Sequence, residues 1–179
     1  MILVDATTLI ALGYIGELNL LLCFDRSIRI EKEVLTEVST EPARTNVANF
    51  ISEDSVGMSA EASDLFREAA EAEREAKKIL GEETVNGDVQ IIANVLRADG
   101  NSAERAVVSD DKRVRTVASG LGVTVTGTIG VIARATEEYD LTAEEGKSLV
   151  RRVDSEGLHM TGELREKAYE LIERAAESE

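Results

Sequence analysis

The sequence predicts an α/β fold with a mainly parallel sheet. Four short, apolar, β-rich runs are each followed by a stretch with helical spacing. These runs are ILV at 2–4, SIRI at 27–30, RAVVS at 105–109 and VTVT at 123–126. Strands that alternate with helices in this way are typical of parallel sheets. At 179 residues, with 43 % hydrophobic residues, the chain fits one folded domain or one domain with a helical extension.

Three helices are predicted in the first third of the chain. The first, at 7–18, carries the apolar residues that follow the opening strand. The second, at 31–38, places its apolar residues on one side with helical spacing. Pro42, the only proline, stands where the third helix should begin, and that helix continues to about residue 52.

A long and highly charged helix is predicted at 59–80, with Gly81 as its stop signal. Its apolar stripe is thin and rich in alanine, so we interpret it as a solvated surface helix, with a partner-binding arm as the alternative. The remaining predicted helices are 88–98, 111–121, 127–138, 142–157 and 161–179.

The strong negative charge bears on the choice of partners. There are 35 acidic residues against 20 basic ones, a formal net charge of −15, whereas nucleic-acid binders are normally basic. One interpretation is a set of solvated acidic faces. The other is a salt-adapted protein, because arginine outnumbers lysine and acid is spread along the chain. In strong salt, counterion release contributes little to RNA affinity, while a metal-bridged phosphate contact would survive.

Several functional classes have little support in the sequence. No apolar run approaches the ~18 residues of a membrane-spanning helix. An acid at position 5 makes the amino terminus a strand rather than a secretory signal. Cys23, the only cysteine, lies in an apolar run and is expected to be a small buried hydrophobe. His159, the only histidine, is expected at the surface, which leaves no base for a serine or cysteine nucleophile. These features predict a cytoplasmic protein.

Acidic residues follow two of the predicted strands. Asp5 ends the first strand, and Asp110 and Asp111 follow the strand at 105–109. Ligands of open parallel sheets bind beyond the carboxyl ends of the strands. An acid in this position can also be a simple helix N-cap. Two such places on one sheet edge favour a functional site.

Two further acids, Glu37 and Asp88, lie in predicted helices and are weaker signals on their own. Asp88 follows Gly87 at a helix start, where the helix dipole alone favours a carboxylate. Acids that converge on one pocket repel each other unless cations are bound, and carboxylates suit Mg²⁺ or Mn²⁺. Metal-assisted hydrolysis is the chemistry that remains: metals would activate a water, clamp a phosphate and neutralise the leaving oxygen.

The acids found so far lie in four segments, which are VDATTLIAL, EVLTEV, NGDVQIIANVLRA and VVSDDKRVRTVASGLGVTVTGTIGVI. These segments resemble the motifs of the PIN-domain family, especially the VapC-like toxins. The resemblance implies that the metal-binding and catalytic acids are Asp5, Glu37, Asp88 and Asp111. Thr7 and Ser109 match hydroxyl positions beside these acids, and Asp110 is an extra acid that shares or takes over the fourth role.

The resemblance also implies an architecture and a function. The expected fold is a three-layer α/β/α domain with a short sheet over 1–135, including the charged helix, and a C-terminal helical extension at 136–179 packed on the same domain. The expected activity is cleavage of single-stranded RNA with Mg²⁺ or Mn²⁺, by a homodimer that a small antitoxin inhibits. Basic residues just after the fourth acid are candidate phosphate contacts or simple partners of nearby acids: Lys112, Arg113 and Arg115.

Two alternatives stay open at this point. A haloacid-dehalogenase-like phosphatase also has an acid after its first strand, but it needs a second aspartate two residues later, where this chain has Thr7. A degenerate PIN scaffold that binds a partner protein would no longer cut. The presence of all four matched acids argues against such an inactive scaffold. An intact metal site should gain stability as the metal concentration rises, whereas an inactive scaffold should not.

Overall fold

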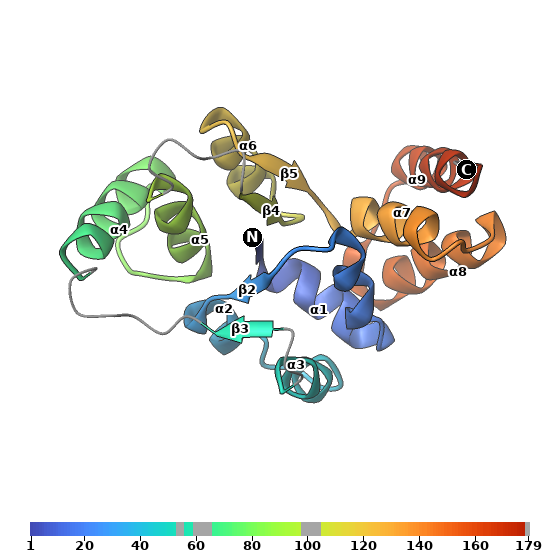
Figure 1. The fold of residues 1–179 in the computed structure, drawn as a ribbon, viewed down its shortest axis with the longest axis horizontal. Coiled ribbons are helices and arrows are strands. Elements are labelled where there is room, and N and C mark those ends of the chain that lie inside the picture. Colours follow the sequence, from blue (N-terminus) through green and yellow to red (C-terminus); the bar gives the residue numbers. More distant parts are fainter. Residues whose placement is uncertain (53–55, 59–65, 98–104, 178–179) are drawn as a thin grey trace.

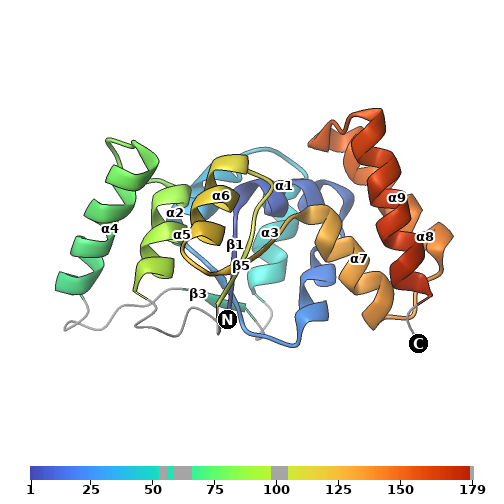
Figure 2. The same ribbon diagram turned by 90° about the horizontal axis from the view of Figure 1, so that it is seen from above.

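A computed structural model describes residues 1–52, 56–58, 66–97 and 105–177. Helices cover both faces of a five-stranded sheet, which gives a three-layer α/β/α arrangement (Figures 1 and 2). The strand order is β3-β2-β1-β4-β5, and every neighbouring pair is parallel. The strands are β1 (Ile2–Val4), β2 (Ile28–Ile30), β3 (Val56–Met58), β4 (Ala106–Val108) and β5 (Thr124–Thr126). The predicted fold class is therefore confirmed.

The edge strand β3 was not predicted from the sequence. It has only three residues, VGM, with a glycine in the middle, so no apolar run marks it. Its place comes from backbone pairing with β2, in which Ile28 lies opposite Val56. The other four strands agree with the predicted runs to within two residues at each end.

Two groups of helices form the outer layers (Figure 2). On one side, α1 packs against α3, and α7 packs against a 3₁₀ helix, η1, that was not predicted. On the other side, α5 packs against α2, α4 and α6. The bounds are α1 Ala6–Ile15, η1 Leu18–Phe24, α2 Lys32–Glu37, α3 Ala43–Ile51, α4 Phe66–Leu80, α5 Gly87–Leu96, α6 Lys112–Gly120 and α7 Thr128–Glu138.

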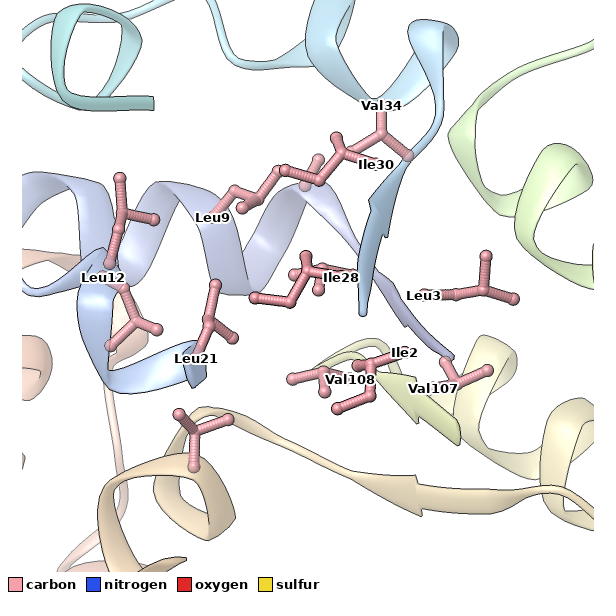
Figure 3. Packing of buried hydrophobic residues seen from close by; sticks show 14 of the residues in the cluster. Ile2, Leu3, Leu9, Leu12, Leu21, Ile28, Ile30, Val34, Val107 and Val108 are labelled. Carbon is pink, nitrogen blue, oxygen red and sulfur yellow. The ribbon is translucent and has the colours of Figure 1, made fainter. Parts of the chain in front are cut away.

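The central strand β1 has no exposed face, since all three of its side chains are buried. Figure 3 shows Ile2 and Val108 on the side of α1, in the same buried cluster as Leu9. Leu3 and Val107 point to the opposite side, toward α5 and α6 (Figure 3). A parallel sheet covered on both faces needs apolar residues at successive positions, which explains the continuous apolar runs in the sequence.

The charged helix α4 has a small apolar side that packs on α5. The buried residues of this side are Ala69, Ala76 and Leu80. Gly81 ends the helix with a φ of 70°, a left-handed conformation that glycine adopts without strain. The predicted beginning of this helix at Ser59 lies outside the described residues. The described part has the character of a solvated surface helix.

The C-terminal helices α8 (Ala143–Val153) and α9 (Gly162–Ala176) pack on each other and on α7, and α8 also contacts α1. A capping box formed by Thr142 and Glu145 begins α8. The helix predicted at 142–157 ends earlier, because Gly157 has a φ of 134° within a π-helical turn, η4 (Asp154–Leu158). The expected boundary at residue 135 falls within α7, and the division into two parts stays a prediction.

Cys23 and His159 lie where the sequence predicts, the cysteine in the interior and the histidine at the surface. Cys23 is buried, and burial raises the pKa of its thiol to about 12. His159 is exposed just after η4. In the part of the chain that the structure describes, no helix combines the length and apolar character needed to cross a bilayer.

The packing of α8 on α7 and α9 depends on the absence of a side chain at Gly146. A Cβ there would lie 2.5 Å from Ile172 Cγ2 and 2.7 Å from Thr136 Oγ1. We expect Gly146→Ala to lower the free energy of unfolding by about 1–3 kcal/mol, the usual cost of overpacking. Urea denaturation measures this loss.

Gly120→Ala is the matched control, since no atom lies within 4 Å of a Cβ at Gly120, in the last turn of α6. Alanine is the better helix former, so this variant should equal or slightly exceed the wild type in stability. Equal losses in the two variants would contradict the packing argument.

Candidate functional site

Asp5 stands at the carboxyl end of the central strand and is only 2 % exposed. Its Oδ1 accepts a hydrogen bond of 2.6 Å from the Ala6 backbone N–H, which caps α1. Its Oδ2 accepts hydrogen bonds from two hydroxyls, Thr7 Oγ1 at 2.8 Å and Ser109 Oγ at 2.6 Å. Both oxygens of this buried carboxylate are therefore fixed in place.

The same two hydroxyls connect the ends of β1 and β4. Thr7 Oγ1 accepts a hydrogen bond of 3.2 Å from the backbone N–H of Asp110. Ser109 Oγ accepts one of 3.1 Å from the backbone N–H of Asp111. Each hydroxyl thus donates to Asp5 and accepts from the loop after β4. This arrangement sets the position of that loop relative to the buried acid.

Glu37 lies in the last turn of α2 and contacts the start of α5. Its Oε1 accepts a hydrogen bond of 2.8 Å from the backbone N–H of Gly87. A Cβ at Gly87 would lie 2.9 Å from this oxygen, so a larger residue at position 87 would displace the Glu37 carboxylate. Asn86 caps α5 through a bond from Val89 N, which places Asp88 in the first turn of that helix.

Electrostatics couples Asp5, Glu37 and Asp88. Burial raises the pKa of Asp5, and the negative charge of Asp88 raises it further, against the hydrogen bonds from Ser109 and Thr7. Burial also raises the pKa of Glu37, with the charges of Asp5 and Asp88 adding to the effect. The structure therefore brings these three acids, from β1, α2 and α5, into one electrostatic cluster.

Arg113, in the first turn of α6, partly neutralises this cluster. Its Nη2 donates to Asp88 Oδ2 at 2.8 Å, and its Nη1 pairs with Glu82 Oε1 at 2.7 Å. Nη1 also donates to the carbonyl of Leu80 at 3.2 Å. The guanidinium therefore joins the end of α4, the start of α5 and the start of α6. Of the two roles left open for Arg113, the structure shows the ion pair, and an RNA contact stays a prediction.

The two acids after β4 turn toward helix starts. Asp111 caps α6, with Oδ1 accepting from the backbone N–H of Arg113 at 2.7 Å and of Val114 at 3.0 Å. Asp110 accepts from the backbone N–H of Thr128 at 2.9 Å and also from its hydroxyl, at the start of α7. Neither Asp110 nor Asp111 is among the charges that raise the pKa of Asp5 or of Glu37. Their roles as ligands stay predictions.

The donor atoms of the cluster suit a hard divalent cation. Carboxylate oxygens are the ligands that Mg²⁺ and Mn²⁺ prefer, and a cation would offset both the burial and the mutual repulsion of these acids. Among the described residues, no three or more acids, histidines or cysteines lie close enough together to hold a metal ion by themselves. Mg²⁺ keeps several waters and commonly uses one or two carboxylates. The donor atoms of the cluster, which are carboxylate oxygens, are therefore of the chemical type that such an ion prefers.

Sequence reasoning missed several residues that shape this edge. Glu31 directly follows β2, is 4 % exposed and pairs with Arg29 at 2.8 Å. Glu31 has the same sequence signal as Asp5, an acid directly after a strand. No local sequence pattern identifies Glu82 or Thr128, because each contributes to this edge only through a partner that is distant in the sequence.

A cavity of about 560 Å³ adjoins the acids on the side of α1. Residues of α1, of the loop after β4 with the start of α6, and of η4 line it. Its lining includes Thr7, Tyr14, Asp110, Lys112, Glu156 and Leu158. Since Thr7 also binds Asp5, the cavity begins one side chain away from the buried acid.

The fold is an α/β/α arrangement with carboxylates gathered at the carboxyl edge of its parallel sheet, where ligands of such sheets bind. A family model for a PIN domain, DUF3368, matches residues 1–174, and the chain belongs to the PIN-domain family. PIN domains are generally nucleases that act on nucleic acid, typically with divalent metals. The match includes α8 and α9. Comparisons with curated proteins and with solved structures give no match.

The raised pKa of Asp5 predicts a pH-dependent stability. A carboxyl group whose pKa is higher in the folded state than in the unfolded state destabilises the protein when it ionises. The loss in the free energy of unfolding is absent below the unfolded-state pKa and complete above the folded-state pKa. We expect Asp5→Asn to raise the free energy of unfolding at neutral pH. The gain should shrink as the pH falls toward about 4, where the wild-type acid is protonated.

Urea denaturation across this pH range, without metal, measures the effect. Asp25→Asn is the control, because Asp25 is exposed. A difference between Asp5→Asn and the wild type that does not change with pH would show that the ionisation of Asp5 does not cost stability.

Proposed function

We propose that this chain is a metal-dependent endoribonuclease that cleaves single-stranded RNA and serves as the toxin of a toxin–antitoxin pair. The observation that carries the proposal is the electrostatic cluster of Asp5, Glu37 and Asp88 at the carboxyl edge of the sheet in a PIN-domain chain. Asp111 acts as the fourth acid, with Asp110 beside it. Mg²⁺ or Mn²⁺, when bound, supplies electrophilic assistance to the phosphate and to the attacking water.

Asp5 and Asp88 are the proposed metal ligands, and each is oriented by a neighbour. The hydroxyls of Thr7 and Ser109 fix Asp5, so the carboxylate cannot turn away from the edge of the sheet. Arg113 holds Oδ2 of Asp88, which leaves Oδ1 available for a metal. Hydrogen bonds of this kind to ligating carboxylates commonly tune metal affinity by 10–100-fold.

Glu37 is the proposed general base. Its Oε1 is bound by the N–H of Gly87, which leaves Oε2 to take a proton from the attacking water. The raised pKa of Glu37, caused by burial and by neighbouring negative charge, makes it a better proton acceptor than an ordinary exposed glutamate. The fixed Oε1 keeps the second oxygen in a defined direction.

The proposed partners follow from the family resemblance and from charge. With a net charge of −15, the protein repels RNA over long distances, so affinity must come from the bound metal and from local cations. A homodimer and a small antitoxin complete the proposal, with the cytoplasm as its location. Exposed leucines on α9, Leu164 at 49 % and Leu171 at 37 %, offer apolar surface for a protein contact. The PIN match argues against the phosphatase alternative.

The first test is cleavage of labelled single-stranded RNA in high salt with Mn²⁺, with EDTA and with Asp5→Asn. We expect the wild-type protein to cut the RNA when Mn²⁺ is present and to leave it intact when EDTA removes the metal. Asp5→Asn should lower the rate by at least about 10²-fold, since it removes the charge of a central ligand. A folded variant that cuts at the wild-type rate would refute the mechanism. No cutting with any metal would favour the inactive scaffold.

The two acids after β4 can be separated with asparagine substitutions. Asparagine caps a helix as well as aspartate, so Asp111→Asn keeps the start of α6 while it removes the charge. We expect Asp111→Asn to lower the cleavage rate by about tenfold or more, with little change in the free energy of unfolding. Asp110→Asn should have the smaller effect on the rate, because Thr128 already holds that carboxylate. The reverse ranking would assign the fourth role to Asp110.

A further inference from the structure

We propose that the cavity between α1, the start of α6 and η4 binds one guanine nucleotide of the RNA, next to the phosphate that is cut. The inference rests on the proposed function and names the base that the site selects. The cavity has a volume of about 560 Å³, within the usual ~300–1,000 Å³ of small-ligand sites. Thr7 belongs both to the cavity lining and to the hydrogen bonds of Asp5, so a nucleotide there would lie beside the acids.

Lys112 is the cation available for the phosphate of this nucleotide. Of the three basic residues after the fourth acid, Arg113 is bound to Asp88 and Glu82, and Arg115 donates to the carbonyl of Ser109 at 2.9 Å. Lys112 is exposed, lines the cavity and has no side-chain hydrogen bond or ion pair within the described part of the chain. Its ammonium group is therefore free to hold a phosphate oxygen.

The three acids of the cavity lining differ in how far their negative charges are already satisfied by hydrogen bonds. Asp110 and Asp111 already accept hydrogen bonds at the starts of α7 and α6, so their charges are partly satisfied by backbone N–H groups. Glu156, in η4, is exposed and has no such partner among the described residues. The cavity thus offers one free cation and one free carboxylate within its described lining.

Tyr14 and apolar side chains form the part of the cavity suited to a base. The Tyr14 hydroxyl donates to Thr40 Oγ1 at 2.8 Å, which limits the orientation of the ring. Ile10 and Ala11 from α1 and Leu158 from η4 add apolar lining. Proteins commonly bind unstacked RNA bases on aromatic rings in this way.

Glu156 decides which base is preferred. A carboxylate has two oxygens that accept hydrogen bonds and none that donate. Guanine alone among the four RNA bases presents two adjacent N–H donors, N1–H and N2–H, with no acceptor between them on its Watson–Crick edge. Both oxygens of Glu156 match these donors. Uracil, whose single N–H lies between two carbonyls, should be the poorest ligand.

The test is isothermal titration of the full chain with GMP and UMP, without metal and in low salt. We expect GMP to bind about tenfold more tightly than UMP. Glu156→Gln should bring GMP down to the level of UMP, because the amide replaces one acceptor with a donor. Lys112→Ala should weaken both nucleotides by a similar factor. Lys78→Ala is the control: it also removes one lysine charge, far from the cavity lining on α4, and should change neither affinity.

Tyr14→Leu keeps apolar volume but removes the aromatic ring, and it should weaken GMP by several fold. Equal affinity for GMP and UMP, or GMP binding that survives both Glu156→Gln and Lys112→Ala, would overturn the proposal. Because the titration needs neither metal nor cleavage, its result is independent of the nuclease test. GMP selectivity without RNA cutting would support the guanine subsite and reject the nuclease. Metal-dependent cutting without GMP selectivity would support the nuclease and reject the guanine subsite.

Discussion

The burial of one carboxylate, Asp5, at the end of the central strand is the constraint on which the rest of this site depends. An ionised group at 2 % exposure is tolerated only when its oxygens are hydrogen-bonded. Here the acceptors are satisfied by one backbone N–H and by the hydroxyls of Thr7 and Ser109. Since Thr7 comes from α1 and Ser109 follows β4, satisfying Asp5 also joins two neighbouring strand ends. The same bonds that offset the cost of burial align the edge of the sheet.

Negative charge at this edge is the second constraint. The charge of Asp88 raises the pKa of Asp5, and the charges of Asp5 and Asp88 raise the pKa of Glu37, while Arg113 compensates for part of the charge of Asp88. The chain therefore keeps a site that is unfavourable without a cation. Under the proposed function, a bound divalent metal would offset this cost, a trade commonly found where function needs clustered charge. The net charge of −15 favours the approach of cations and opposes the approach of polyanions such as RNA.

The sequence predicted much of the fold because both faces of the sheet are buried. Apolar runs such as 2–4 and 105–109 marked four strands, and the acids after two of them led to the prediction of a site at the carboxyl edge. The strand β3 escaped prediction because it is held by pairing with β2 rather than by an apolar pattern of its own. The 3₁₀ helix η1 escaped because the apolar run LNLLLCF shows no helical alternation of polar and apolar positions.

The roles of individual acids were harder to predict than their positions. Asp5 and Asp111 follow strands in the same way, and both cap helices. What separates them is burial and the partners that each carboxylate finds across the fold. Asp5 meets two hydroxyls and the charge of Asp88, whereas Asp111 meets the backbone of its own helix. A local sequence pattern contains the strand end and the cap but not the residue on the opposite strand. The difference in burial and in partners between Asp5 and Asp111 therefore arises only when β1, β4 and α5 come together.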